Sequence, residues 1–447
     1  MSDLRRTKSR AVVVLFAMSG ADASASHTKL CSTTLAASAA AAATTCSHDV
    51  SRRGVLHTAT ALASGIVPSA AHADGDEERQ KYFLRFPTLF APLYGESSRR
   101  TIKRQLGDRI WALEQQTSAL EQNLELGPLE TPLRCVVVRL QDGSLWVHAP
   151  LAPSREFFEL VESCAEECGA PSPGPSPSSA VRHIVVPTYA LEHKVFAKDA
   201  LLRWSDAQLW LSPGQFSFPR RSVSDEFVWG RRPSGVLSLS DEDAGAPAVP
   251  WAMELPYQTL AAGTFSIGGT PTTFYETAFF HRASRSLIVT DALARVPIEA
   301  PPLSDPARLL LAGWEKTALL VSFFFPEHEE ADPAAGLGVV TWTEGWHDNF
   351  RALAGRLLVP PVVRTLLYAQ DPAAVRRWVD AVARRWQFEQ IVPAHFEAPI
   401  RASPSEFARA FAFLEDERID AFPAGDTARG LRPIARIASS ALRASEE

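Results

Sequence analysis

The stretch HIVVPTYALEHKVF, residues 183–196, places polar side chains directly after an apolar strand. The run HIVV has the unbroken apolar character of a strand that is covered on both faces. Glu192, His193 and Lys194 follow, where a parallel strand would connect to a helix. Open α/β sheets carry functional side chains at such strand ends. These residues alone leave three readings open: a working metal site, a former one, or an ordinary strand-to-helix junction.

Strands and helices alternate around this stretch. We expect strands at 182–187 and 207–213, with a helix over 192–204 between them, which favours an α/β architecture. Asp142-Gly143 separates two β-rich runs and predicts a hairpin. Near the carboxyl end, Asp371 and Pro372 begin a helix, and Ser403 with Glu406 forms the capping-box pattern that begins another.

Two further segments are expected outside this alternation. Ile102, Leu106, Ile110 and Leu113 recur at helical spacing, so we expect a helical extension over residues 74–130. Residues 217–262 are rich in Pro, Gly and acidic residues and read as an irregular insertion. A loop of that length inside a domain is often functional, so a lid is one expectation for it.

The composition excludes several classes of protein. The chain is 46 % hydrophobic and 21 % charged, which is typical of a globular protein, and its net charge of −6 gives no basic footprint for nucleic acid. We expect no transmembrane helix in the mature chain, because no apolar run is long enough. Phosphate-binding loops, dinucleotide glycine fingerprints and serine nucleophile elbows are missing from the sequence.

The first 73 residues read as a targeting region. Their Ala, Ser and Thr content resembles a plastid transit peptide, and Arg52 and Arg53 precede a mildly apolar stretch that ends in small residues at 71–73. The second part resembles a twin-arginine signal, which predicts delivery to a plastid and, further, to the thylakoid lumen. The alternative is a disordered segment with arginines there by chance. Residues 426–447 read as a carboxyl-terminal tail.

Two more apolar strands end in residues that bind metals. SLIVTD ends in Asp291, and QIVPAH ends in His395. If these strand ends meet Glu192 and His193, two imidazoles and two carboxylates form a ligand set suited to Zn²⁺ or a similar divalent ion. A single strand-end Asp or His is more often a cap or a satisfied buried group. The conjunction of three strand ends is what predicts a site.

Five segments together resemble a family of plant, algal and cyanobacterial proteins of unassigned function, itself a divergent relative of the metallo-β-lactamase-fold hydrolases. They are RLQDGSLWVHAPLAPSRE (139–156), HIVVPTYALEHKVF (183–196), LSPGQFSFP (211–219), FFHRASRSLIVTDAL (279–293) and IVPAHFEAPI (391–400). The resemblance implies a four-layer αββα sandwich over residues 131–425, with the helical extension and the long insertion added to it.

The resemblance also implies a reduced metal site. The motif His-x-His-x-Asp-His of such enzymes aligns its last two residues with Glu192 and His193, which puts Thr188 and Ala190 where its first two histidines would stand. The first metal site is then lost. The second would keep its ligands as Glu192, His193, Asp291 and His395.

The expected cofactor is one divalent metal, zinc first and iron or manganese as alternatives, or none. Two residues are candidates for catalysis beside it. Lys194 brings a cation next to the site, where it would take part in catalysis or neutralise the carboxylates without a metal. His281 lies beside a predicted hairpin turn from which it could reach the site.

Two functions follow from these expectations. The first is a plastid metal-dependent hydrolase of an ester, thioester or phosphodiester, acting on a small-molecule substrate. The alternative is a non-catalytic protein that uses the degenerate cleft to bind a protein partner or a small ligand, such as an assembly factor of the photosynthetic apparatus. Bound metal favours the first function, and its absence favours the second.

Overall fold

The structure is a computed structural model of the 447-residue chain. It describes residues 76–85, 94–117, 131–167, 180–215, 224–267, 270–303, 314–323, 328–330, 340–342, 345–419, 422–424 and 427–432. The targeting region expected at 1–73 lies outside these residues, as does the tail after residue 432. From Glu77 onward the described chain belongs to one compact unit, and a second unit, Asp22–Asp76, is described only at Asp76.

The first sheet has seven strands in sequence order. They are β3 (Ile102–Gly107), β4 (Ile110–Thr117), β5 (Thr131–Arg139), β6 (Leu145–His148), β7 (Val181–Val186), β8 (Gln208–Leu211) and β9 (Gly235–Val236). Strands β3 to β6 pair antiparallel, and β6 to β9 pair parallel. The hairpin expected at Asp142-Gly143 joins β5 to β6 and is confirmed, with Gly143 at a φ of 85°.

The second sheet has five strands in the order β10, β11, β12, β15, β16. Their bounds are β10 (Tyr257–Ile267), β11 (Thr270–His281), β12 (Ser286–Ile288), β15 (Gln390–Val392) and β16 (Ile400–Arg401). Strands β12 and β15 are parallel neighbours, so their carboxyl ends lie at the same edge of this sheet. Two antiparallel pairs form separate two-stranded sheets: β1 (Lys81–Arg85) with β2 (Tyr94–Ser98), and β13 (His328–Glu330) with β14 (Val340–Trp342).

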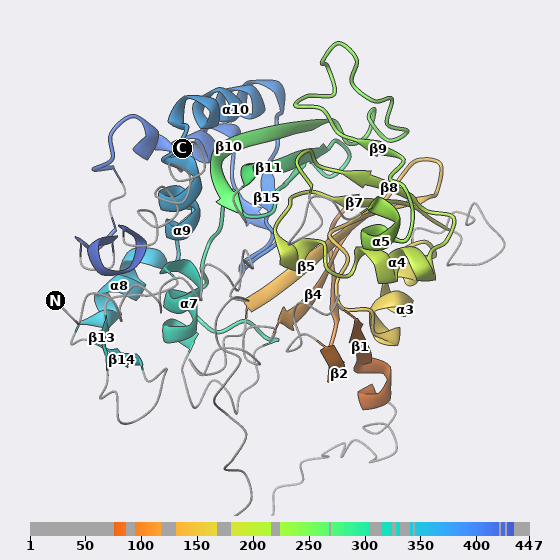
Figure 1. Ribbon diagram of the computed structural model, residues 1–447, viewed down its shortest axis with the longest axis horizontal. Coiled ribbons are helices and arrows are strands. Elements are labelled where there is room, and N and C mark those ends of the chain that lie inside the picture. Colours follow the sequence, from red (N-terminus) through yellow and green to blue (C-terminus); the bar gives the residue numbers. More distant parts are fainter. Residues whose placement is uncertain are drawn as a thin grey trace, which may run out of the picture. The chain divides into compact units, whose positions relative to one another are not determined.

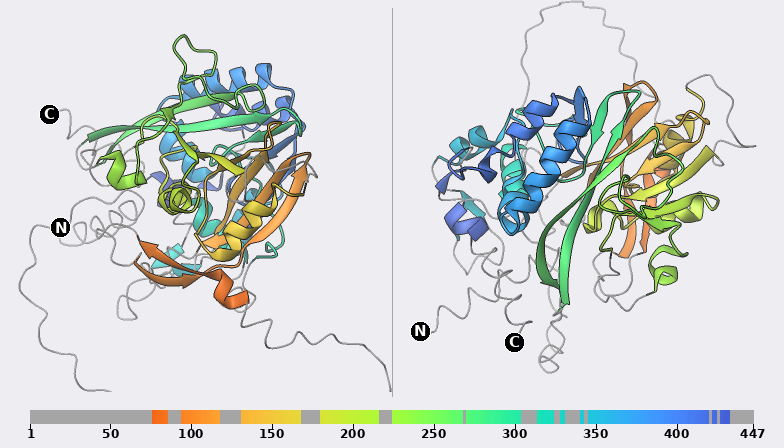
Figure 2. Two further views of the ribbon diagram at one scale, coloured as in Figure 1. Left: turned by 90° about the vertical axis from the view of Figure 1, so that its right-hand side faces the viewer. Right: turned by 90° about the horizontal axis from the view of Figure 1, so that it is seen from above.

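The two sheets pack face to face with helices on both outer faces (Figures 1 and 2). Helices α3 (Arg155–Ser163) and α4 (Ala197–Arg203) share a hydrophobic cluster with the first sheet, and α10 (Pro372–Arg385) and α11 (Pro404–Arg409) share one with the second. A third cluster, which includes Trp146, Tyr257 and Phe279, lies between the sheets. The expected αββα sandwich is therefore confirmed.

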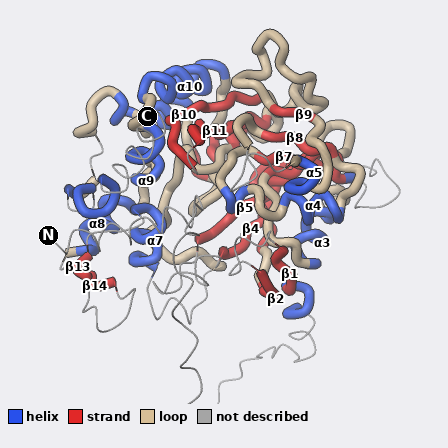
Figure 3. Tube along the Cα trace, in the orientation of Figure 1, coloured by secondary structure: helices blue, strands red, loops and turns tan. Residues whose placement is uncertain are grey.

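The remaining helical segments lie along the connections between strands, except the last two, which follow β16 (Figure 3). They are η3 (Leu191–His193), α5 (Asp225–Trp229), α7 (Trp314–Phe323), α8 (Trp346–Leu353), α9 (Pro361–Val363), η5 (Arg364–Tyr368), η6 (Ala412–Leu414) and η7 (Thr427–Leu431). Helices α7 and α8 share a separate cluster that includes Trp314, Phe350 and Phe396. Among the described residues, no helix has the length and apolar character needed to cross a membrane.

Strand β5 shows why the central strands are apolar throughout. Cys135 and Val137 face the cluster under α3, whereas Val136 and Val138 face the cluster between the sheets. Alternate side chains of a strand point to opposite faces. A strand covered on both faces therefore needs apolar residues at every position, which is what the run CVVV supplies.

The helix expected from residues 102–113 is wrong. These residues form β3 and β4, joined by a tight turn in which Arg109 has a φ of 54°. Ile110 faces the cluster between the sheets and Leu113 faces the cluster under α3, so both faces of β4 are buried. Apolar residues on both faces of a strand can coincide with helical spacing, and here the Gly107-Asp108 pair marks a turn.

Residues 224–256 of the expected insertion cross from one sheet to the other. They include α5 and β9, and Trp251 and Leu255 pack in the cluster between the sheets with at most 1 % of their surface exposed. Within the same segment, Ser240 forms an antiparallel β-bridge with Gln258 of β10. These residues are part of the sandwich, so the expectation of a lid is wrong for 224–256; residues 217–223 lie outside the described ranges.

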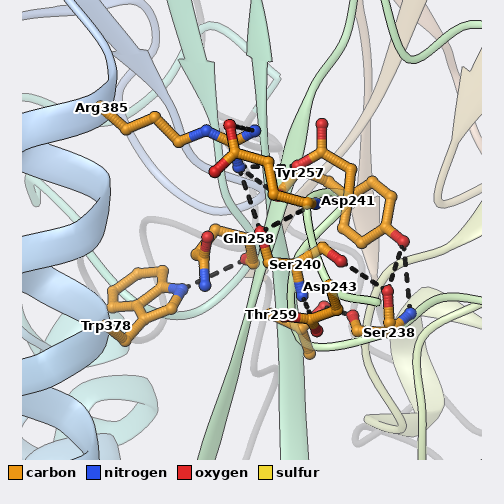
Figure 4. A network of polar contacts seen from close by, with 10 residues as sticks. Ser238, Ser240, Asp241, Asp243, Tyr257, Gln258, Thr259, Trp378 and Arg385 are labelled. Atoms are coloured by element: carbon orange, nitrogen blue, oxygen red, sulfur yellow. Dashed lines mark hydrogen bonds and ion pairs between the residues drawn. The ribbon is translucent and has the colours of Figure 1, made fainter. Parts of the chain in front are cut away.

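Polar contacts hold the end of this crossing against α10 (Figure 4). Arg385 pairs with Asp241 at 2.6 Å and with Glu242 at 2.7 Å, and it also donates to the Tyr257 carbonyl oxygen. Trp378 of the same helix donates from Nε1 to the carbonyl oxygen of Gln258 at 3.2 Å. Helix α10 begins as the sequence predicts, with the Asp371 side chain accepting from the Ala374 N–H and Pro372 in its first turn.

Candidate metal centre

Glu192, His193, Asp291 and His395 converge at one edge of the sandwich. Glu192 and His193 lie in η3, five residues beyond the end of β7 in the first sheet. Asp291 and His395 each lie three residues beyond the ends of β12 and β15, which are parallel neighbours in the second sheet. One ligand atom from each of the four lies within 4.8 Å of the other three. Two facing sheets, rather than one, bring the strand ends together.

Three of these side chains form a tight triangle. His193 Nε2 lies 3.3 Å from Asp291 Oδ1 and 3.3 Å from His395 Nε2, and His395 Nε2 lies 3.2 Å from Asp291 Oδ1. His193 is fully buried, and Asp291 and His395 keep about 15 % of their side-chain surface exposed. The triangle therefore has a buried corner and two corners that open towards solvent.

The triangle has the size of one face of a tetrahedral metal centre. Ligand atoms at about 2.0–2.1 Å from a tetrahedral zinc ion lie about 3.3–3.4 Å from one another. The three distances of 3.2–3.3 Å match that spacing. Two imidazole nitrogens and a carboxylate oxygen are also the ligand types such an ion takes. The residues present therefore fit a mononuclear centre.

The tautomer of His395 suits a ligand role. Its Nδ1 lies 3.0 Å from the carbonyl oxygen of Pro132, which can only accept a hydrogen bond. Nδ1 must then carry the proton, and in the neutral ring Nε2 presents a lone pair to the triangle. Metal-binding histidines are commonly oriented by such a contact on the other nitrogen. Among the described residues, His193 Nδ1 has no comparable partner.

The charges of the triangle reinforce one another. Burial alone would raise the pKa of Asp291, but the charge of His193 and the hydrogen bonds from His193 and His395 outweigh it and hold this pKa well below its usual range. For His193, burial lowers the pKa, and the charge and hydrogen bond of Asp291 more than reverse this effect, so the pKa is raised. Asp291 is therefore an anion at every physiological pH.

Lys194 lies beside the centre and is almost fully buried. Its Nζ donates to Gln215 Oε1 at 3.4 Å and lies 5.8 Å from the centre of the Tyr189 ring. Burial lowers the pKa of this amine to about 7, although the charge of Glu192 acts in the opposite direction. Gln215 also donates to the Thr188 carbonyl oxygen at 2.7 Å, so it joins the Lys194 amine to the segment between β7 and η3.

His281 is not brought to this centre. It pairs with Ser286 at the first residue of β12, whereas Asp291 follows the last residue of that strand. Its Nδ1 bonds to Ser284 Oγ at 2.7 Å, and burial lowers its pKa to about 4. His281 thus lies at the other end of β12 from the ligand triangle.

Two supporting residues escaped the sequence reasoning. Glu276 on β11 accepts hydrogen bonds from the backbone N–H groups of residues 290, 291 and 292. Arg134 on β5 donates to the backbone carbonyl oxygens of Pro393 and Phe396, on either side of His395. The signal for both was a lone charged residue inside an apolar strand, in FYETAFF and PLRCVVV. Such a residue needs a partner when it is buried.

These layers define a four-layer αββα sandwich, and a cluster of candidate metal ligands lies at its strand ends. The chain belongs to the family described as Domain of unknown function (DUF4336), whose model matches residues 107–413. Comparison with curated protein sequences finds no match.

Solved structures similar to this chain include two kinds of metalloprotein. One is the metallo-β-lactamase FIM-1 from Pseudomonas aeruginosa in its mono-zinc form, with 12 % identity over 71 % of this chain and 95 % of that chain and a TM-score of 0.33. Another is the metal-soaked Flv1 flavodiiron core from Synechocystis, with 9 % identity over 72 % of this chain and 62 % of that chain and a TM-score of 0.38. The fold assignment rests on the layers of this chain and not on these likenesses.

Proposed function

We propose that the protein binds one divalent metal ion through Glu192, His193, Asp291 and His395 and acts as a metal-dependent hydrolase. The observation that carries this proposal is the triangle of two imidazole nitrogens and one carboxylate oxygen with edges of 3.2–3.3 Å. A bound divalent ion would supply Lewis acidity, which lowers the pKa of water and polarises a carbonyl or phosphoryl oxygen. Esters, thioesters and phosphodiesters are the substrate classes that this chemistry suits.

The chain's own residues have separate tasks in this proposal. Asp291 stays ionised, and in the neutral form of His395 the Pro132 carbonyl oxygen keeps the ring proton on Nδ1, so both side chains present a ligand atom to the centre. Glu192 is half-buried at the rim and completes the ligand set. Lys194, with a pKa of about 7, can hold or give a proton at Nζ beside the centre.

A second function is supported because hydrogen bonds within the triangle can pair its polar atoms without a metal. With one imidazole protonated, Asp291 Oδ1 accepts hydrogen bonds from two rings at 3.2–3.3 Å. A metal-free polar cluster of this kind supports a non-catalytic binding protein, such as an assembly factor that uses the degenerate site for a protein partner. Delivery to a plastid also stays a prediction, since it rests on residues 1–73.

Elemental analysis of the purified full chain tests the first proposal. We expect about one equivalent of zinc, iron or manganese in the parent protein, and loss of that metal in the Asp291→Ala and His395→Ala variants. The His281→Ala variant is the matched control, because that histidine lies at the other end of β12, and it should keep its metal. If the parent and all three variants are folded and metal-free, the metal centre is refuted and the binding function takes its place.

A further inference from the structure

Glu276 lies where the three ligand-bearing segments meet. It occupies the middle of β11, and its side chain is fully buried. Its backbone forms a bridge with Thr188, four residues before Glu192, and the neighbouring Thr277 N–H donates to the Pro187 carbonyl oxygen at 2.8 Å. Glu276 is thus attached to the segment that carries Glu192 and His193.

The side chain of Glu276 reaches the second ligand segment. One oxygen, Oε1, accepts the N–H groups of Thr290 at 2.8 Å, Asp291 at 3.1 Å and Ala292 at 3.1 Å. Three consecutive N–H groups that converge on one carboxylate oxygen fix the backbone on both sides of Asp291. Glu276 thus contacts the backbone at Asp291 and at both of its neighbours.

The same contact extends to the third segment. The Thr290 carbonyl oxygen accepts the N–H of Ala394 at 3.2 Å, and Ala394 directly precedes His395. Residues 188, 290–292 and 394 are thus joined through one side chain and two backbone contacts.

We propose that Glu276 is the positioning residue of the metal centre: by binding the N–H groups of residues 290–292, it sets Asp291 at the spacing that the metal requires. This inference rests on the proposed metal function, and it assigns Glu276 no contact with metal or substrate. The length of the Glu276 side chain is what matters, because its oxygen must extend from β11 to the three N–H groups. A charge at that place is not what the contact needs, since an amide oxygen also accepts hydrogen bonds.

Two conservative variants separate reach from charge. Glu276→Asp keeps the charge but draws the carboxylate back by up to about 1.5 Å, roughly one carbon–carbon bond. Glu276→Gln removes the ionisable group but keeps an acceptor oxygen at the original distance. Glu162→Asp is the control for shortening a buried glutamate, because Glu162 accepts from Arg203 at 2.8 Å and from Trp204 at 3.0 Å and contacts none of the residues 290–292.

The first readout is zinc affinity of the full chain, measured by competition with a chromophoric chelator. Loss of a contact that orients a ligand typically weakens metal binding about 10–100-fold. We expect a loss in that range for Glu276→Asp, a smaller one for Glu276→Gln, and none for Glu162→Asp. A Gln variant as weak as the Asp variant, or an Asp variant with the parent's affinity, would overturn the inference.

The second readout needs no metal. Hydrogen–deuterium exchange of the metal-free protein should show faster exchange at residues 290–292 in Glu276→Asp and parental exchange there in Glu276→Gln. If the parent binds no zinc, the proposed function fails, and this comparison still decides the role of Glu276. Parental exchange at 290–292 in both variants, or equal acceleration in both, would show that Glu276 does not position the segment.

Discussion

Arg134 donates a hydrogen bond of 2.5 Å to the carbonyl oxygen of Phe396, so the first residues of β5 hold the segment that carries His395. Only 2 % of the surface of Arg134 is exposed. It also pairs with Glu114 of β4 at 2.7 Å and donates to the Pro393 carbonyl oxygen. His395 Nδ1 also contacts the Pro132 carbonyl oxygen, so the first sheet supports a candidate ligand that follows a strand of the second.

Replacing this guanidinium should destabilise the protein clearly. The Arg134→Met variant leaves the Pro393 and Phe396 carbonyl oxygens without their buried donor, although Glu114 keeps its pair with Arg104 at 2.5 Å. We expect the free energy of unfolding to fall by roughly 2–4 kcal/mol, the range for a broken buried polar contact. Urea unfolding followed by tryptophan fluorescence measures it.

An exposed arginine pair provides the comparison. Arg155 pairs with Glu159 at 2.8 Å, and 71 % of the Arg155 side chain is exposed. Arg155→Met should change the free energy of unfolding by less than about 1 kcal/mol. Equal small losses in both variants would mean that the buried contacts to the His395 segment do not support the fold.

Acid should destabilise the protein through His148. Burial, with a smaller contribution from the charge of His193, lowers the pKa of His148 to about 3, whereas an unfolded histidine titrates near 6.5. Between these values the unfolded chain binds the extra proton, so stability falls as the pH falls from about 6.5 towards 3. At pH 5 the loss from this one group is about 2 kcal/mol.

Comparison with a variant isolates that group. His183 and His281 also have pKa values lowered by burial, to about 4 in each, so the parent loses stability from several histidines at once. The unfolding free energy of His148→Leu should fall less between pH 7 and pH 5 than that of the parent. Urea titrations at each pH measure both. Curves of equal slope for parent and variant would contradict the lowered pKa of His148.

Arg385 should keep residues 238–243 in place. In Arg385→Ala, the pairs with Asp241 and Glu242 are lost, and we expect amide exchange in 238–243 to rise roughly tenfold, the factor that corresponds to ~1.4 kcal/mol. Exchange mass spectrometry of the full chain measures it. Arg384→Ala is the control, since Arg384 is exposed on the same helix, and unchanged exchange in both variants would show that the network does not hold this segment.

Short-range signals in the sequence predicted the local structure well. The Ser403–Glu406 capping box and the Asp371–Pro372 helix start involve residues at most three positions apart, and both form as expected. The interactions that decide them are complete within one turn of chain. The strands at 102–117 were missed for the opposite reason. Their apolar residues pack in two separate clusters, one on each face of the strands. The local sequence around Leu106 does not indicate which distant elements will cover each face.

The sequence predicted which candidate ligands would converge but not which residues would support them. Asp291 and His395 each end an apolar strand, which is a local pattern, and the resemblance to a known family joined them to His193. The role of Glu276 depends on residues 290–292 and on Thr188, and that of Arg134 depends on a segment more than 250 residues away. Contacts of this kind follow from the packing of two sheets. Their only signal in the sequence is a charged residue inside an apolar run.

The division of the site between the two sheets has a consequence for pieces of the chain. A fragment that ends after β9 contains Glu192 and His193, and the remaining piece contains Asp291 and His395. Neither piece alone holds the triangle. On the proposed metal function, zinc uptake by a mixture of the two pieces would therefore report that they have reassembled across the Trp146–Phe279 interface. In such a mixture the proposed ion would link the two pieces, because its full set of ligands is present only when both pieces are.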